Sequence, residues 1–277
     1  MTNQTMKWPL LGFALLLSGA AFGQPTSERI PVPLADPNRP VFLKVGLISG
    51  GITVKGYAGK EVIVEATRSP ENEDNRPEEK PVGKMKLIPN TSMGLTVEEE
   101  DNTVTISTGL RGISEQIDLA IQVPVSCSMK LSTVNGGDIQ VENVNGDLEV
   151  NNTNGSITLK KIAGSAVAQT VNGEVRVEFT RVNADKAMSF ITLNGDIDVT
   201  FPASLKATVH LKSEQGEIYS DFDVQMQKTE ARVDKNEKGK GKYRVTMEKA
   251  MRGTINGGGQ EIQFNNFNGS IYIRKGG

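Results

Sequence analysis

The residues with the clearest chemical potential are the acidic and hydroxyl side chains that follow a regular series of glycines. Glycine returns every nine residues at positions 137, 146, 155, 164 and 173, and the residues that follow are Asp138, Asp147, Ser156, Ser165 and Glu174. Calcium needs several anionic oxygens held together, and calcium-binding nonapeptide repeats keep an aspartate at a fixed place in successive units. This series loses its carboxylates midway, so it predicts no calcium site.

Catalytic and metal-binding groups of other kinds are scarce. His210 is the only histidine and Cys127 the only cysteine, and together they cannot supply a closed zinc site of nitrogen and sulfur ligands. His210 stands in the alternating stretch KATVHLKS with no nucleophile motif beside it, so we expect a histidine on a strand surface. Cys127 has no partner for an intramolecular disulfide, and we expect a buried thiol. We predict no catalytic residue, no metal and no cofactor.

A carbohydrate-active enzyme would need two carboxylates about 5–10 Å apart. If residues 18 apart in the sequence are neighbours, the outward rows are Gln140, Thr158 and Arg176 on one side, and Glu149 and Val167 on the other. Neither row contains a pair of acids. Tyr219 and Tyr272 are the best candidates for exposed aromatic rings that could stack on a sugar, although a packing role is equally compatible with their positions.

The first 23 residues have the pattern of a secretory signal peptide. Lys7 precedes an apolar run from Trp8 to Leu17, and small residues follow, with predicted cleavage before Gln24. The apolar run is shorter than the roughly 20 residues of a membrane-spanning helix. No cysteine lies near the cleavage point, which excludes the lipoprotein route. We therefore expect an exported protein, located in the periplasm, outside the cell or at the cell surface, with no membrane span after cleavage.

Charge and size give weaker information. The formal net charge of the 277-residue chain is −2, with no clustered basic footprint of the kind that nucleic-acid binders carry. Two charged segments, near 68–84 and 228–244, lack apolar periodicity and indicate solvated loop insertions. Residues 24–277 are expected to form a single domain.

The elements that position these residues are short alternating strands. Apolar residues stand two places after each glycine of the series, at Ile139, Leu148, Ile157, Ala166 and Val175. Alternation with period two is typical of strands with one buried face. The same phrase recurs in LISGGITV, TLNGDIDV and FNGSIYI, so the repeat extends from near residue 45 to the C-terminus. The sequence predicts an all-β chain.

Two arrangements of these strands compete. In one, each Asn-Gly is a hairpin turn in an antiparallel meander. In the other, each is the corner of a β-solenoid whose coils stack strand on strand, so that every coil buries its neighbour's apolar face. Two units of nine residues would make a coil of about 18 residues, close to known repeat lengths. The second arrangement is favoured: a single-domain, parallel β-helix-like solenoid of nine-residue half-coils, right-handed by the crossover preference.

In this solenoid the asparagines and glycines are structural turn positions. Asparagine tolerates the left-handed backbone region and bonds locally, so it suits a corner and could stack into partial ladders. The predicted turn positions are Asn145, Gly146, Asn154, Gly155, Gly164, Asn172, Gly173, Asn194, Gly195, Asn268 and Gly269.

A family resemblance rests on these repeats. IDLAIQVP, the run NGDLEV, NGSITL and NGEVRV, and the closing INGGGQEIQFNNFNGSIYI resemble the bacterial putative-adhesin family of exported β-strand-repeat domains, a domain of unknown function. The resemblance covers residues 40–277 and includes no catalytic motif. It implies a β-solenoid at the cell envelope.

These observations lead to one functional expectation with two alternatives. The protein is expected to be non-enzymatic and adhesin-like, presenting a recognition surface to a glycan or to another envelope protein. The first alternative is a periplasmic scaffold that binds one protein partner in a stress or signalling system, and the second is a polysaccharide-active enzyme. Self-association through the solenoid ends is expected if they are uncapped, and the segment before residue 45 is the candidate cap.

Overall fold

The structure is a computed structural model that describes residues 27–68, 94–108, 116–227, 232–234, 244–246 and 250–276. Within these ranges the chain forms strands and turns, and no helix occurs that could span a membrane. The predicted signal peptide and most of the two predicted charged insertions lie outside the described residues. Of the second insertion, predicted to be a loop, residues 232–234 form a short strand.

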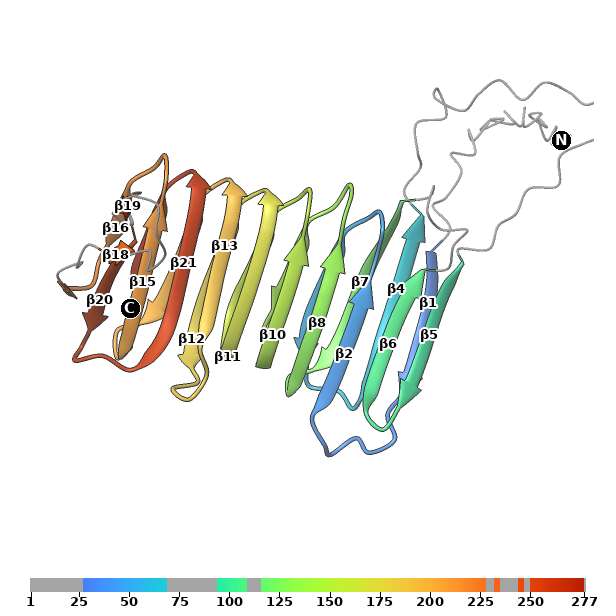
Figure 1. Ribbon diagram of the computed structural model, residues 1–277. Coiled ribbons are helices and arrows are strands. Elements are labelled where there is room, and N and C mark those ends of the chain that lie inside the picture. Colours follow the sequence, from blue (N-terminus) through green and yellow to red (C-terminus); the bar gives the residue numbers. More distant parts are fainter. Residues whose placement is uncertain are drawn as a thin grey trace, which may run out of the picture.

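Two β-sheet faces run the length of an elongated stack (Figure 1). The front face contains, in spatial order, β5 (Leu95–Glu100), β6 (Thr103–Thr108), β2 (Val41–Gly46), β8 (Cys127–Thr133), β10 (Asn145–Asn152), the second half of β11 (Ile157–Asn172), β13 (Met188–Asn194), β21 (Gln260–Asn268), β15 (Ala207–Ser213), β20 (Met251–Ile255) and β17 (Val224–Met226).

The rear face is built in the same way from the other half of each coil. It contains, in spatial order, β1 (Ser27–Pro33), β4 (Glu61–Arg68), β7 (Ile117–Pro124), β3 (Ile52–Tyr57), β9 (Ile139–Glu142), the first half of β11, β12 (Val175–Val182), β14 (Ile197–Pro202), β22 (Ile271–Gly276) and β16 (Ile218–Ser220). The short strands β18 (Arg232–Asp234) and β19 (Arg244–Thr246) pair separately.

Parallel pairing in the middle of the stack decides between the two predicted arrangements. Asn145 pairs with Ala163, and Ile157 pairs with both Ile139 and Val175, at the spacing predicted for one coil. Because a meander of hairpins would make these pairs antiparallel, the hairpin interpretation is wrong here. The described part of the chain is all-β and β-solenoid-like. The predicted outward rows are also confirmed, since Thr158 lies between Gln140 and Arg176, and Glu149 pairs with Val167.

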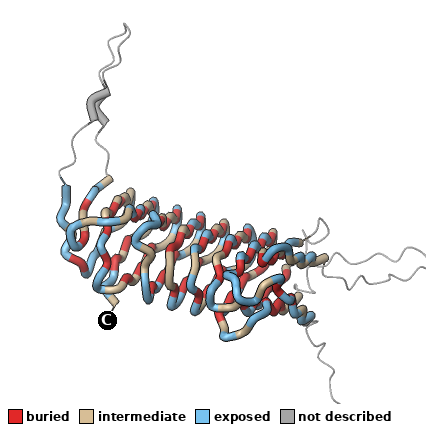
Figure 2. Tube along the Cα trace, turned by 90° about the horizontal axis from the view of Figure 1, so that it is seen from below, coloured by how far each residue is buried: buried red, intermediate tan, exposed pale blue. Residues whose placement is uncertain are grey.

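The core lies between the two faces and is filled by every second residue. Figure 2 shows buried and exposed residues alternating along the coils. The apolar residues predicted to face inward, such as Ile139, Leu148, Ile157 and Val175, are all buried. Toward the C-terminal end the core becomes aromatic, where the Phe179 and Phe201 rings stack with centroids 5.3 Å apart. Burial of one such side chain contributes about 1.5–3 kcal/mol.

Chain order and spatial order differ at both ends of the stack. The first coil, β2 and β3, lies between β6 and β7 on one side and β8 and β9 on the other. The last coil, β21 and β22, lies between the β13–β14 coil and the β15–β16 coil. Both terminal coils are therefore inserted into the stack, and neither forms its end.

Antiparallel strands close the two ends instead. At one end β1 pairs with β4 and β5 with β6, and at the other end β20 pairs with β15 and β17. Edge strand β1 contains Pro31 and Pro33, which cannot donate to an added strand. Edge strands β16 and β17 have three residues each. These features oppose edge pairing with a second molecule.

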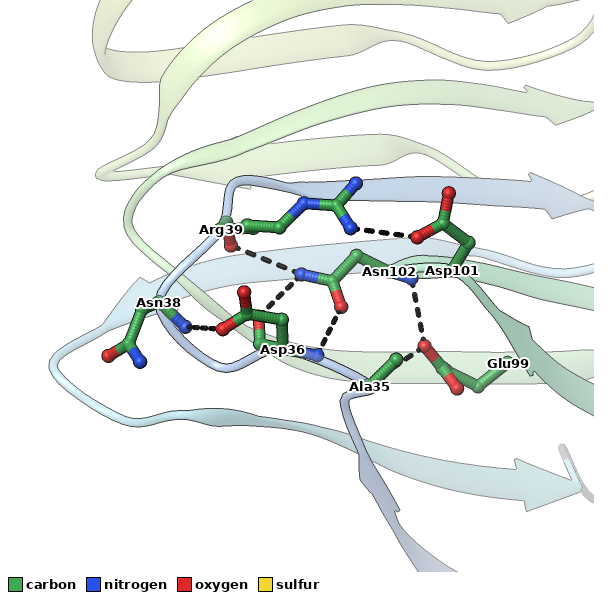
Figure 3. Close-up of polar contacts among 7 residues, drawn as sticks. All are labelled: Ala35, Asp36, Asn38, Arg39, Glu99, Asp101 and Asn102. Atoms are coloured by element: carbon green, nitrogen blue, oxygen red, sulfur yellow. Dashed lines mark hydrogen bonds and ion pairs between the residues drawn. The ribbon is translucent and has the colours of Figure 1, made fainter.

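The predicted N-terminal cap is partly confirmed. β1 and the loop after it cover the end, whereas β2, which also begins before residue 45, lies inside the stack. The loop is held to the β5–β6 turn by the buried Asn102 (Figure 3). Asn102 Nδ2 donates to the Asp36 carbonyl at 2.6 Å, and its Oδ1 accepts from the Asp36 amide at 2.7 Å. Arg39 adds an ion pair with Asp101 at 2.8 Å.

Candidate functional site on the front face

The predicted turn positions occupy two opposite corners of the coil. At the first corner, where the front face turns into the rear face, the stacked glycines are Gly50, Gly137, Gly155, Gly173, Gly195, Gly269 and Gly216. At Gly195 the backbone φ of +139° and the carbonyl oxygen of Gly173 both exclude a Cβ atom. Glycine is needed at this corner because successive coils approach there backbone to backbone.

An asparagine ladder runs beside these glycines. Asn154, Asn172, Asn194 and Asn268 each donate from Nδ2 to the Oδ1 of the asparagine on the preceding coil of the stack, at 2.8–3.1 Å. The first acceptor is Asn135, which is not among the predicted turn positions. Its turn, VNGGD, has two glycines. The nine-residue series contains the second of them, Gly137, so the residue before it is Gly136 and not the asparagine.

The second corner holds Asn145, Gly146 and Gly164. Gly146 pairs with Gly164, but Asn145 pairs with Ala163 and Ser126. Asn145 is therefore not a rung of the asparagine ladder, because its neighbours at this corner are not asparagines. The nine-residue glycine series alternates between the two corners.

Buried polar side chains satisfy the carbonyl groups of the first corner. Thr192, for example, is 2% exposed and donates from Oγ1 to the Gly173 carbonyl at 2.9 Å. Equivalent bonds, of 2.8–3.3 Å, reach Gly50, Gly137, Gly155, Gly195 and Gly269 from Thr133, Asn152, Thr170, Asn266 and Ser213. A carbonyl shielded from water without a partner is costly, so this inner ladder stabilises the corner.

The acidic and hydroxyl residues after the glycines also serve the backbone. Asp138 Oδ1 accepts from the Ser156 amide at 2.8 Å, and Asp196 Oδ1 accepts from the Ser270 amide at 2.8 Å. Ser165 donates from Oγ to Asp147 Oδ1 at 2.6 Å. Among the described residues no group of three or more histidine, cysteine or acidic side chains is placed to hold a metal ion.

A groove crosses the outer side of the front face over β11, β13, β21 and β15. It consists of two hollows of about 570 and 470 Å³ that adjoin at Lys212 and Asn265. We call it the front-face groove. Its larger hollow is lined chiefly by Gln169, Val171, Ile191, Leu193 and Phe267, and its smaller one by Val167, Ser189, His210, Glu261 and Gln263.

The strand register arranges these groove residues in rows along the solenoid axis. One row runs from Gln169 through Ile191 and Asn265 to Lys212, each on the next strand of the face. A second row runs through Val167, Ser189, Gln263 and His210. The third contains Val171, Leu193 and Phe267, each one residue before a rung of the asparagine ladder.

The sequence matches the model of the Toastrack DUF4097 family over residues 118–256. The chain belongs to this family. The match begins in β7 and ends just after β20, so it includes the whole nine-residue glycine series. Membership confirms the family resemblance predicted from the sequence.

Solved structures with a similar chain course share little sequence with this Toastrack protein. A "putative cell adhesion protein" from Clostridium sporogenes is 14% identical, with 91% of this chain and 100% of that chain covered and a TM-score of 0.43. A "putative adhesin" from Bacteroides fragilis is 10% identical, with 90% and 97% covered and a TM-score of 0.35. No curated protein matches the sequence. Similarities at this level carry no conclusion about function.

The apolar wall of the groove is unusual for a solvent-facing sheet. Val171, Leu193 and Phe267 are 39%, 45% and 44% exposed. Ile191 stands next to them at the same face and lines the same hollow. Outward positions of a solvated sheet are normally polar, and contiguous exposed apolar surface is a candidate for an interaction site.

The polar groups of the groove in this Toastrack protein fall into two kinds. Gln169, Gln263 and Asn265 make no side-chain hydrogen bond with another described residue. The charged groups are paired, with Lys212 Nζ 3.1 Å from Glu214 Oε1 and Arg252 Nη2 3.8 Å from Glu261 Oε1. The groove therefore offers unpartnered amides beside mutually neutralised charges.

The two residues considered first for catalysis have ordinary structural roles. His210 lies on β15 with its outward neighbours, and Arg252 Nε donates to its Nε2 at 3.2 Å. The prediction of a strand-surface histidine is confirmed. Cys127 is fully buried, and burial raises the pKa of its thiol to about 12. The prediction of a buried thiol is confirmed as well.

The rear face carries the two tyrosines. Tyr219 and Tyr272 point outward on β16 and β22 and stack on each other, with ring centroids 5.2 Å apart and planes 9° apart. Arg274 lies over the Tyr272 ring and bonds Asp198 at 2.7 Å. One face of each ring is thus used within the protein, which favours the packing role over an open sugar platform.

Proposed function

We propose that the mature chain is an exported, non-enzymatic recognition protein that acts in an adhesin-like way and binds its ligand in the front-face groove. The observation that carries this proposal is the combination of an exposed apolar wall, formed by Val171, Leu193 and Phe267, with unpartnered amides at Gln169 and Asn265. Burial of the apolar wall against a ligand is favourable, and hydrogen bonds from the ligand can replace those that the amides now make with water.

Rigidity supports the same proposal. The groove residues stand on hydrogen-bonded parallel strands, and the asparagine ladder fixes the corner beside them. A surface that is ordered before binding loses little conformational entropy on association. Stacked coils thus provide an extended binding surface without a deep pocket.

The groove lacks the arrangement expected of a glycosidase. Its carboxylates, Glu214 and Glu261, are each close to a cation, Lys212 and Arg252 respectively. Glu261 is also 67% exposed, whereas the general acid of a glycosidase can lie in an apolar pocket. This arrangement supports binding rather than hydrolysis.

A scaffold that binds one envelope protein is the second candidate, favoured by the aliphatic character of Val171, Ile191 and Leu193.

The export part of the proposal rests on the N-terminal signal pattern, and the intact mass of the exported chain should correspond to a start at Gln24. We further propose that the coils are right-handed and built of nine-residue half-coils, because crossovers between parallel strands are overwhelmingly right-handed. A crystal structure checks this directly.

The test is a binding isotherm of the fluorescently labelled exported chain on envelope fragments of the source cells. Leu193→Asp places a charge on the apolar wall and should weaken binding at least tenfold. Thr158→Asp makes the same type of change on the outward rear face and should leave binding unchanged. Thermal unfolding of both variants checks that they are folded. Equal binding by Leu193→Asp and the wild type would overturn the proposal.

A further inference from the structure

We propose that the front-face groove binds a neutral glycan chain lying along the solenoid axis, across the strands; this inference rests on the function proposed above. It assigns the ligand class and its direction from three features of the groove: the hydrogen-bonding type of its free side chains, its charge balance and the repeat of its rows.

The free side chains match hydroxyl groups. Gln169, Gln263 and Asn265 each carry a carbonyl acceptor and an NH2 donor, and none is used by another described residue. A hydroxyl both donates and accepts, so a polyhydroxylated ligand can satisfy both ends of each amide. A purely anionic ligand would use only the donors and leave the acceptors without partners.

The charge balance selects a neutral ligand. The cation that lines the groove, Lys212, already has a carboxylate in Glu214, and Arg252 on the neighbouring strand β20 has one in Glu261. His210 Nε2 accepts a hydrogen bond from Arg252, so this nitrogen is also engaged within the protein. A charged ligand would have to displace one of these pairs, whereas a neutral ligand leaves them in place.

The apolar wall fits the same ligand. Leu193 and Phe267 stand side by side at the groove rim, next to Asn265. Ligand sites combine an apolar lining with a few placed polar groups. The carbon-bound hydrogens of a sugar ring form an apolar face, and its hydroxyls form a polar edge. A ring packed on the wall would therefore direct its hydroxyls toward the amides.

An extended peptide is a poorer match, although it too has donors and acceptors. Peptides that lie as strands are usually recognised at a sheet edge, where main-chain groups are free. The backbone of β13 and β21 is paired on both sides within the sheet. The groove lies on the sheet face, so only side chains are available to the ligand.

The rows define the direction of the chain. Neighbouring strands of a sheet are about 4.8 Å apart, so groups repeat at this interval along the solenoid axis and the groove from β11 to β15 extends over about 14 Å. Gln169 and Asn265 stand in one such row, on either side of Ile191. A polymer with a short repeating unit can contact this row at successive strands only if it runs along the axis.

The experiment uses the exported chain, biotinylated and presented as streptavidin tetramers, on an array of neutral and acidic glycans, followed by isotherms with the neutral glycans that bind. We expect binding to neutral glycans that changes less than twofold between 50 and 500 mM NaCl. The double variant Gln169→Ala/Asn265→Ala should weaken it by roughly tenfold or more, as expected for the loss of two hydrogen bonds. The rear-face double variant Gln140→Ala/Thr158→Ala is the matched control and should bind as the wild type does.

Three outcomes would overturn the inference. They are binding to acidic glycans alone with a strong salt dependence, glycan binding that survives the front-face double variant, and the absence of any glycan signal. Protease treatment of the envelope fragments separates the two proposals. If it abolishes Leu193-dependent binding, the groove recognises a protein, so the proposed function stands and the glycan inference fails. If Leu193→Asp has no effect on envelope binding, the proposed function itself fails.

Discussion

Replacing Thr192 by valine tests the inner ladder of buried polar side chains. Valine keeps the β-branched shape of threonine and removes only the hydroxyl that donates to the Gly173 carbonyl at 2.9 Å. That carbonyl receives no other hydrogen bond from the described residues. Leaving a buried acceptor without a partner costs about 1–3 kcal/mol, and the added methyl group returns at most about 0.8 kcal/mol. Taking the middle of the first range, about 2 kcal/mol, we expect a net loss of about 1 kcal/mol.

Urea unfolding followed by circular dichroism measures this loss. With a denaturant slope of about 3 kcal/mol/M, a loss of about 1 kcal/mol should lower the midpoint by about 0.3 M. Thr158→Val is the matched control, because Thr158 faces outward on the rear face and its hydroxyl has no hydrogen-bond partner in the described residues. Its free energy of unfolding should stay within about 0.5 kcal/mol of the wild-type value, as is typical of surface changes. A Thr192→Val variant as stable as the wild type would show that the corner carbonyls do not need these side chains.

Three further predictions concern the corners and the core. Gly195→Ala should lower the free energy of unfolding, measured by thermal unfolding, by about 2–4 kcal/mol, since φ is +139° and a Cβ would collide with the Gly173 carbonyl. Gly257→Ala, where φ is +87° and the space is open, should lower it by only about 1 kcal/mol. Asn172→Ala removes the bonds to Asn154 and from Asn194 at an exposed position and should lose about 1 kcal/mol. A thiol reagent at pH 8 should leave Cys127 unmodified in the native protein and label it in urea, because the raised pKa of about 12 keeps the native thiol protonated. The same shift means that the free energy of unfolding falls as the pH rises above the pKa of the thiol in the unfolded state. Rapid labelling of the native protein would contradict both statements.

The middle of the fold follows from local pattern. Alternation fixes which residues face inward, and the nine-residue glycine spacing places Thr158 between Gln140 and Arg176. Both signals depend only on residues close in the sequence. The Asn135 rung was missed because an extra glycine in its turn shifts the count by one position.

The groove could not be derived in the same way. One row of the groove joins Gln169 on β11 to Ile191 on β13, and Ile191 to Asn265 on β21. In the chain, however, the strands β14 to β20 lie between β13 and β21. The phrases TLNGDIDV and FNGSIYI are equally compatible with stacking in chain order, so nothing local indicates that β21 inserts between β13 and β15. The pairing is decided by how the coil ends fit together, which a single repeat does not encode.

This insertion links the front-face groove to completion of the fold. In a simple repeat stack each coil contacts only its neighbours in sequence, and folding can propagate from any point. Here Gln263, Asn265 and Phe267 come from the last coil and lie between strands made from earlier segments. The front-face groove therefore exists only after the C-terminal coil has inserted, a pairing of high sequence separation that slows folding. A chain that has not closed its stack has no groove, so the proposed recognition requires the completely folded protein.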